Sequence, residues 1–248
     1  MEFEGRKVIF KSLVGSHNYN LNTPKSDKDY KVVVLPNYDD IYFSKSLSKN
    51  YESKTEDISA HDIRKYTNSL YKSNINFIEG LFSDNVIINC DFDSKSMSLI
   101  EEYFSLKDEI ASLNLAHLYK SSSHMYLNKL KNLKVKTGTN DELIDMFGYN
   151  TKSASTAWRI LDFLIRYGRT NFSDFKKAIW YVEEDRNRNF YFELKNGEIS
   201  FDEFCSIVEE KYNEVEGKWR DIYLSKPVHE YDYERVVKIV KELVRFNI

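Results

Sequence analysis

The chain has 248 residues and a formal net charge of −3, with 42% hydrophobic and 30% charged residues. This composition is typical of a globular protein with one large domain or two small ones, and it excludes disordered and collagen-like chains. Two cysteines, Cys90 and Cys205, are too few for a disulfide scaffold and do not form a zinc motif. The slightly acidic balance excludes nucleic-acid binding through bulk positive charge, so any such contact requires a local patch.

The first residues lack the basic region and the apolar segment of a signal peptide. No apolar run approaches the ~20 residues that a membrane-spanning helix requires. We therefore expect a cytoplasmic protein that has no membrane partner.

The N-terminal part of the sequence predicts strands that alternate with helices. Apolar, β-branched runs indicate strands and helical spacing indicates helices. The strands are expected at residues 8–14, 30–35 and 56–60, and the helices at 62–71 and 76–82. The first strand stops at Gly15-Ser16, which is a turn and helix-start signal.

From about residue 96 the pattern becomes helical. Apolar positions at helical spacing predict helices over 115–133, 152–167 and 231–246, and Gly168 is placed where a C-terminal cap belongs. The segment Ser200–Glu203 fits a capping box at the start of another helix. The fold class is therefore α+β, with an α/β domain over residues 1–95 and a mostly helical domain over 96–248.

Residues that carry chemistry are concentrated between positions 15 and 31. Free backbone N–H groups after Gly15-Ser16 favour an anion such as phosphate. Asp27 and Asp29 are two apart at a predicted strand start, so their side chains are expected on the same face. Carboxylates held that close repel one another unless a cation lies between them, and Mg²⁺ prefers such ligands. The segment therefore predicts a phosphate site that faces a divalent-metal site.

This pattern resembles the DNA polymerase β nucleotidyltransferase superfamily, and within it the RNA-ligase-associated (RlaP-like) group of predicted nucleotidyltransferases. The matching positions are Gly15, Ser16, Tyr19, Ser26, Asp27, Asp29 and Lys31. Asn20 stands where the group has glycine, which is a mild change because Asn tolerates a positive φ better than other non-glycine residues.

The resemblance continues further along the chain. Asp57 matches the third carboxylate of the group, with Glu56 and Asp62 as alternatives because a register slip would turn a different side chain inward. Asn76 and Glu79 lie in another matching segment, although a helix cap and a surface glutamate explain them equally well.

A helix in the second half also matches, with two differences. Lys152 and Arg159 correspond to residues of the group, but Ser153 and Thr156 replace its two histidines. Lys152, Arg159 and Arg166 are seven apart and are expected to form one basic stripe. Such a stripe suits a cleft that closes over a nucleotide.

The resemblance implies residue roles in two-metal phosphoryl transfer. Asp27, Asp29 and Asp57 are the implied catalytic and metal-binding residues, with Mg²⁺ or Mn²⁺ as cofactor, and Asp57 is also a candidate base for the acceptor hydroxyl. The implied contacts to the nucleoside triphosphate are Gly15, Ser16, Lys31, Lys152 and Arg159.

The implied activity is transfer of a nucleotidyl group from a nucleoside triphosphate such as ATP to an acceptor hydroxyl, with release of pyrophosphate. RNA, in particular a tRNA end, is the expected acceptor, while a protein or a small molecule remains open, as does the base of the nucleotide. Two alternatives also remain: a catalytically silent nucleotide- or RNA-binding module, and a subunit with a protein partner of the toxin–antitoxin type.

Overall fold

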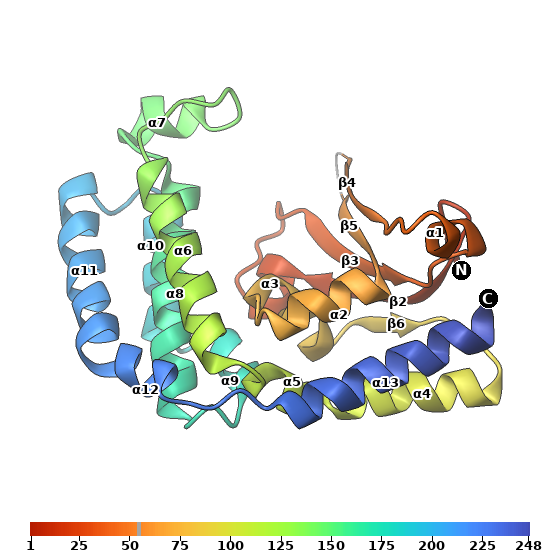
Figure 1. The fold of residues 1–248 in the computed structure, drawn as a ribbon. Coiled ribbons are helices and arrows are strands. Elements are labelled where there is room, and N and C mark those ends of the chain that lie inside the picture. The colour runs from red at the N-terminus through yellow and green to blue at the C-terminus, as the bar shows by residue number, and fades with distance from the viewer. Residues whose placement is uncertain (54–55) are drawn as a thin grey trace. The chain divides into compact units, whose positions relative to one another are not determined.

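The structure is a computed structural model that describes residues 1–53 and 56–248, and the chain divides into two compact units. The sheet unit comprises residues 1–114 and 228–248, and the helical unit comprises residues 115–227. This division differs from the boundary predicted at 95/96, because the last helix, α13 (Glu230–Asn247), returns to pack beside α4 (Ser94–Ser105) in the sheet unit (Figure 1). The α+β fold class is confirmed.

The sheet unit is built on a mixed sheet that has six strands among the described residues, in the order β1-β2-β3-β5-β4 with β6 paired to β2. Strands β3 and β5 are parallel, and the other neighbours are antiparallel. The bounds are β1 Glu2–Phe3, β2 Arg6–Val14, β3 Lys28–Val34, β4 Ser48–Glu52, β5 Glu56–Asp62 and β6 Val86–Ile88. The three predicted strands are therefore confirmed as β2, β3 and β5.

The sheet unit also contains several short helices. They are the 3₁₀ helix η1 (Gly15–Tyr19), α1 (Tyr38–Tyr42), α2 (Ile63–Tyr71), α3 (Ile75–Ile78), the 3₁₀ helix η2 (Glu79–Phe82) and α5 (Lys107–Ser112). Helix α2 begins where the side chain of Asp62 accepts a hydrogen bond from the backbone N–H of Arg64. Apolar side chains from β2, β3 and β5 meet in a buried cluster, so the strands are fixed by their apolar faces.

The helical unit packs around one long, buried helix, α8 (Thr151–Arg169). Its main helical neighbours in this unit are α6 (Leu115–Lys131), α9 (Phe175–Ile179), α10 (Arg186–Lys195) and α11 (Phe201–Glu214), and it also contacts α7 (Asp141–Phe147) and the π-helical segment η3 (Val215–Trp219). The unit also contains α12 (Arg220–Leu224). The helices predicted over 115–133 and 152–167 are confirmed. The predicted cap is also confirmed, since the Ser200 side chain accepts from the Glu203 N–H at the start of α11.

The prediction that Gly168 caps α8 is wrong. The helix continues to Arg169 and its C-cap is Thr170. A Cβ at Gly168 would overlap the indole ring of Trp219. Glycine is therefore present because a tryptophan lies directly against the α8 backbone, and this neighbour is invisible in the local sequence.

We expect Gly168→Ala to lower the free energy of unfolding by about 1–3 kcal/mol, because the new methyl group must displace the Trp219 ring. Urea unfolding followed by circular dichroism measures this loss. Gly217→Ala is the matched control, because a Cβ there meets nothing within 4 Å. That variant should be unchanged or up to about 1 kcal/mol more stable. Equal stabilities for the two variants would contradict the packing argument.

Two further findings bear on the sequence analysis. Among the residues that the structure describes, no helix has the length and apolar character needed to cross a bilayer. Cys90 and Cys205 are both free thiols.

Candidate active site

Two of the predicted catalytic carboxylates lie side by side at the start of the parallel strand pair. Asp29 is the second residue of β3, Asp57 is the second residue of β5, and the two are direct partners in the register. Neighbouring strands are ~4.8 Å apart, and partner residues point to the same face of the sheet. Both side chains line one hollow of about 300 Å³ on the sheet unit.

This hollow is rich in acidic side chains. Glu52, the partner of Asp57 on β4, and Glu79 at the start of η2 also line it. Glu79 is 4% exposed and accepts a hydrogen bond from the backbone N–H of Gly15, at 3.1 Å from nitrogen to Oε2. Four carboxylates around one small hollow create a negative potential that favours a cation.

The glycine of the Gly-Ser turn is required by its neighbour Asp29. Gly15 has φ +68°, and a Cβ there would overlap the carboxylate of Asp29. The chain then forms the 3₁₀ helix η1, which ends at Asn20 with φ +59°. Asn20 therefore adopts a left-handed conformation, which Asn tolerates better than other non-glycine residues.

Lys31 places a positive charge against the carboxylates. It is 6% exposed, lines the hollow, and its ammonium lies 4.2 Å from the centre of the Phe77 ring. Burial lowers the pKa of Lys31, while the charges of Glu79 and Asp29 act in the opposite direction. A buried cation at this position reduces the repulsion among the carboxylates.

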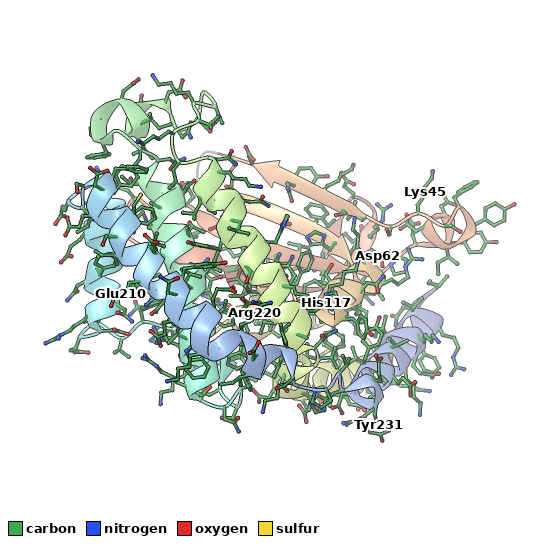
Figure 2. All side chains as sticks on the ribbon, turned by 60° about the vertical axis from the view of Figure 1, so that its left-hand side comes forward. Lys45, Asp62, His117, Glu210, Arg220 and Tyr231 are labelled. Atoms are coloured by element: carbon green, nitrogen blue, oxygen red, sulfur yellow. The ribbon has the colours of Figure 1, made fainter. Side chains whose placement is uncertain are left out.

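The two alternatives to Asp57 face other partners. Glu56 is one residue earlier in β5 and lies 3.9 Å from the ammonium of Lys11. Asp62, labelled in Figure 2, is fully buried, caps α2 and binds the guanidinium of Arg64 at 2.5 Å. Of these three residues, Asp57 lines the hollow with Asp29, whereas Glu56 and Asp62 do not.

Asp27 and Ser16 are placed differently from Asp29. Asp27 precedes β3 and is exposed, and neither it nor the half-buried Ser16 lines the hollow. Asp27 follows a tight turn in which the Thr23 N–H donates to the Ser26 hydroxyl at 2.9 Å. Strand geometry therefore positions Asp29, while a turn positions Asp27.

The basic residues predicted to form a stripe on α8 do not form a continuous exposed surface. Lys152 is exposed, but Arg159 is only 8% exposed. Arg166 lies 3.4 Å from the carboxylate of Asp185 and donates to the backbone carbonyl of Lys177 at 2.9 Å. The three residues share a helical face, but other parts of the helical unit cover most of it.

A histidine network lies beside the hollow. His61 is within hydrogen-bonding distance of Ser48 at Nδ1 (3.2 Å) and of Ser59 at Nε2 (2.8 Å), and Ser59 donates to Asn50. Ser59 and Asn50 both line the hollow. Burial, reinforced by the charges of Lys31 and Lys65, lowers the pKa of His61 to about 4, so the ring is neutral at pH 7.

This lowered pKa makes stability depend on pH in a defined window. Below pH 6.5 the unfolded chain binds a proton on this imidazole that the folded protein does not, so stability falls as the pH decreases from about 6.5 to about 4. We expect His61→Gln to remove about 2 kcal/mol of the stability loss between pH 7 and pH 4.5.

Urea unfolding at both pH values measures the difference. His124→Gln, at an exposed position of α6, is the control and should keep the wild-type pH dependence. Parallel pH curves for wild type and His61→Gln would show that burial of this ring does not govern acid stability.

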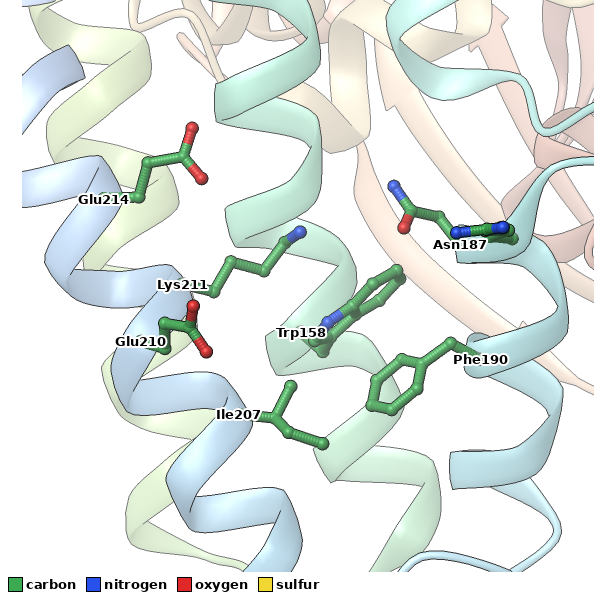
Figure 3. A pocket seen from close by; sticks show the side chains of 8 residues that line it. Trp158, Asn187, Phe190, Ile207, Glu210, Lys211 and Glu214 are labelled. Carbon is green, nitrogen blue, oxygen red and sulfur yellow. The ribbon is translucent and has the colours of Figure 1, made fainter.

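A second hollow, of about 430 Å³, lies in the helical unit between α8, α10 and α11 (Figure 3). Trp158 and Phe190 contact each other on one side of it, with ring centres 5.0 Å apart. Lys211 also lines it and binds the buried carboxylate of Asp162 at 2.8 Å. None of the predicted site residues lines this hollow.

Sequence reasoning left Glu79 ambiguous and missed Glu52 and Asn50. A signal for Glu79 was present, because it lies in the segment that resembles the RlaP-like group. Glu52 and Asn50 gave no signal, because they belong to a short polar strand whose partner is decided by sheet pairing.

The donor set fits a divalent cation of the magnesium type. Mg²⁺ takes oxygen ligands, often one or two carboxylates completed by water and substrate phosphates. Asp29 and Asp57 supply such a pair. Within residues 1–53 and 56–248 no three Asp, Glu, His or Cys side chains are gathered closely enough to form a metal cage by themselves.

A mixed sheet that presents paired carboxylates next to a Gly-Ser turn is the arrangement expected of a polymerase-β-like nucleotidyltransferase domain. The model of the RlaP family, described as an RNA repair pathway DNA polymerase beta family, matches residues 2–138. The match spans more than half of the chain, and the chain belongs to this family. Membership supports a nucleotidyltransferase-type role. No curated protein matches the chain.

Proposed function

We propose that the protein is a metal-dependent nucleotidyltransferase that moves a nucleoside monophosphate from a nucleoside triphosphate to a hydroxyl group of RNA. The observation that carries this proposal is the pairing of Asp29 with Asp57 across parallel strands in a member of a polymerase-β-like family. The acceptor oxygen forms a bond to the α-phosphorus, the bond from that phosphorus to the bridging oxygen breaks, and pyrophosphate leaves.

Each residue of the predicted site has a role in this proposal. Asp29 and Asp57 would hold Mg²⁺ or Mn²⁺, with Asp27 as the further ligand that the family resemblance implies, and Asp57 would accept the proton of the attacking hydroxyl. A divalent ion bound there would supply charge neutralisation at the phosphates and would make the acceptor hydroxyl easier to ionise. Gly15 keeps space for the Asp29 carboxylate, which would be displaced by any side chain at this position.

The remaining predicted contacts concern the triphosphate. Lys31 and Ser16 are proposed to bind phosphate oxygens from the sheet unit. Lys152 and Arg159 stay predicted contacts from the resemblance, as does a closing role for the helical part of the chain. Of these two α8 residues, Lys152 has the exposed side chain.

A labelling experiment tests the proposal. The purified protein is incubated with each α-labelled nucleoside triphosphate, Mg²⁺ or Mn²⁺, and total RNA, beside the double variant Asp27→Asn/Asp29→Asn. We expect label in RNA and release of pyrophosphate with wild type but not with the double variant. Asp108→Asn, an exposed carboxylate on α5, is the matched control and should label RNA like wild type.

Other results would change the proposal in defined ways. Label in a protein band from added lysate would keep the reaction and replace RNA by a protein acceptor. Absence of label and of pyrophosphate release with every nucleotide would exclude the transferase and favour the silent binding module.

A further inference from the structure

Helix α1 exposes an unusual number of large apolar side chains. Tyr38, Ile41, Tyr42 and Phe43 lie within six residues and are 68%, 41%, 68% and 57% exposed. The rings of Tyr38 and Tyr42 stack with centres 6.1 Å apart, and Tyr42 meets Phe43 edge-on at 4.9 Å. We call Tyr38, Tyr42 and Phe43 the aromatic platform. Gathered exposed apolar groups of this kind mark interaction sites.

The platform is held on a firmly anchored helix. Asp40 points inward from α1, is 2% exposed, and accepts two hydrogen bonds of 2.6 Å from the guanidinium of Arg6. That guanidinium holds the pKa of the Asp40 carboxyl below its usual value. Asn37 and Asp40 also form a capping box at the start of the helix. The exposed rings are therefore positioned before any partner arrives, which lowers the entropic cost of binding.

A cationic groove of about 340 Å³ is lined in part by Ile41 of α1 and by Lys45, just after it. Arg64 and Lys65 also line it, together with Ser44, Ser46 and Asn68, and no described carboxylate does. Arg64 is bound by Asp62, whereas Lys45 and Lys65 are exposed and form no ion pair within the described part of the chain. Figure 2 labels Lys45 beside α1. In a chain of net charge −3 this groove favours an anion.

We propose that the aromatic platform and this groove bind a single-stranded segment of the RNA acceptor. Exposed aromatic rings interleaved with cations are the feature by which proteins hold unpaired nucleotides, since bases stack on rings while lysines contact phosphates. A protein partner would bury the rings against an apolar surface, which a groove lined by cations, hydroxyls, an amide and a single apolar residue, Ile41, does not continue. The inference rests on the proposed function for the choice of RNA as the acceptor.

The platform lies at the opposite end of β3 from the carboxylates. Asp29 is near the start of β3, and the strand ends shortly before α1. Leu35, the first residue after β3, is six residue steps from Asp29, which is about 20 Å at ~3.3 Å per step. A stacked strand that advances ~3.4 Å per nucleotide covers this distance in about six nucleotides. An acceptor of three nucleotides is therefore too short to reach from the paired carboxylates to the aromatic platform.

A binding measurement tests the platform directly. Fluorescence anisotropy of a labelled, unstructured 12-nucleotide RNA is recorded with the full chain in the absence of nucleoside triphosphate. We expect Tyr38→Ala/Tyr42→Ala/Phe43→Ala to weaken binding at least tenfold, because each lost stacking contact reduces affinity. Tyr231→Ala, which removes a 73% exposed ring on α13, is the control and should bind like wild type.

Salt dependence tests the groove separately. Lys45→Gln/Lys65→Gln should reduce the slope of log K against log salt concentration by about 1.4, because each lost phosphate contact on a single strand removes ~0.7. Lys238→Gln/Lys241→Gln, on the exposed side of α13, should leave the slope unchanged. Circular dichroism is the control that checks whether each of these surface variants is folded.

The outcomes separate this inference from the proposed function. Asp29→Asn should abolish pyrophosphate release and keep the RNA affinity. The platform variant should keep the release seen with a trinucleotide acceptor and lose the advantage of the 12-nucleotide acceptor. Wild-type affinity in both surface variants, or no RNA binding by wild type, would overturn the inference while leaving nucleotidyl transfer to be judged on its own assay.

A change in oligomeric state would also overturn the inference that the aromatic platform binds RNA. If sedimentation shows that the platform variant dissociates a wild-type oligomer while its RNA affinity is unchanged, the platform is a protein-docking surface. If RNA binding depends on the platform but wild type releases no pyrophosphate with any nucleotide, the proposed function fails and the RNA-binding site stands.

Discussion

Replacing Asp29 by asparagine is expected to reduce kcat for nucleotidyl transfer by about 10³-fold, which corresponds to about 4 kcal/mol of transition-state stabilisation. Asparagine keeps the shape of the side chain but removes the charge that the proposed cation requires. The structure places this carboxylate against Gly15 and beside Asp57, at the site proposed for the cation. Pyrophosphate release at saturating nucleotide and metal measures the effect.

The fold should survive this substitution. Asp29 lies in an acidic hollow, and loss of one of its charges reduces repulsion among the remaining carboxylates. We therefore expect a melting temperature within a few degrees of wild type. Asp108→Asn is the control for activity and stability, as in the labelling experiment. Wild-type kcat in Asp29→Asn would remove the paired carboxylates from the mechanism, whereas unfolding would make the activity loss uninformative, and Asp57→Asn would then take its place.

Gly15→Ala is expected to reduce kcat about 10²-fold and to destabilise the protein by about 1–2 kcal/mol. Two effects combine. An alanine at φ +68° is strained by about 1 kcal/mol, and its methyl group overlaps the Asp29 carboxylate. The activity loss follows from displacement of that carboxylate, since a misplacement of about 1 Å in a catalytic group costs about this much.

Gly5→Ala separates the two effects. Gly5 has nearly the same φ, +69°, but a Cβ there meets nothing within 4 Å. The Gly5→Ala variant should therefore lose stability through backbone strain but keep its activity. Urea unfolding and pyrophosphate release measured on both variants test this. Equal activity losses in Gly5→Ala and Gly15→Ala would mean that strain, and not contact with Asp29, governs activity.

Local sequence signals predicted much of the fold. The strands β2 and β3 contain apolar, β-branched runs that end at glycine or proline, so their positions could be read directly, whereas β5 is more polar and gave a weaker signal. Strand β4 could not be read in this way, because it is short, polar and exposed, and only pairing with β5 makes it a strand. The cap assigned to Gly168 failed for a related reason, since the residue that requires glycine there is Trp219, about fifty positions away.

The candidate site also combines features that the local sequence shows with features that only the tertiary structure shows. The Gly15-Ser16 turn and the spacing of Asp27 and Asp29 were legible in the sequence, and so was the resemblance that the family match confirms. The choice among Glu56, Asp57 and Asp62 could not be made from spacing. All three lie in one strand, and which of them lies opposite Asp29 depends on how that strand pairs with its neighbour. The parallel pairing of β3 with β5 brings Asp57 to Asp29.

By itself, the sequence determined the fold class, the family and the residue types of the site, because these depend on short-range patterns that each segment carries. Tertiary structure decided which carboxylates share a hollow, that Lys31 and Glu79 are buried against them, and that Arg159 is covered. It also decided that the rings of α1 remain in solvent. Burial and strand register arise from contacts between segments distant in the chain, and an apolar residue looks the same in sequence whether it joins the core or an exposed platform.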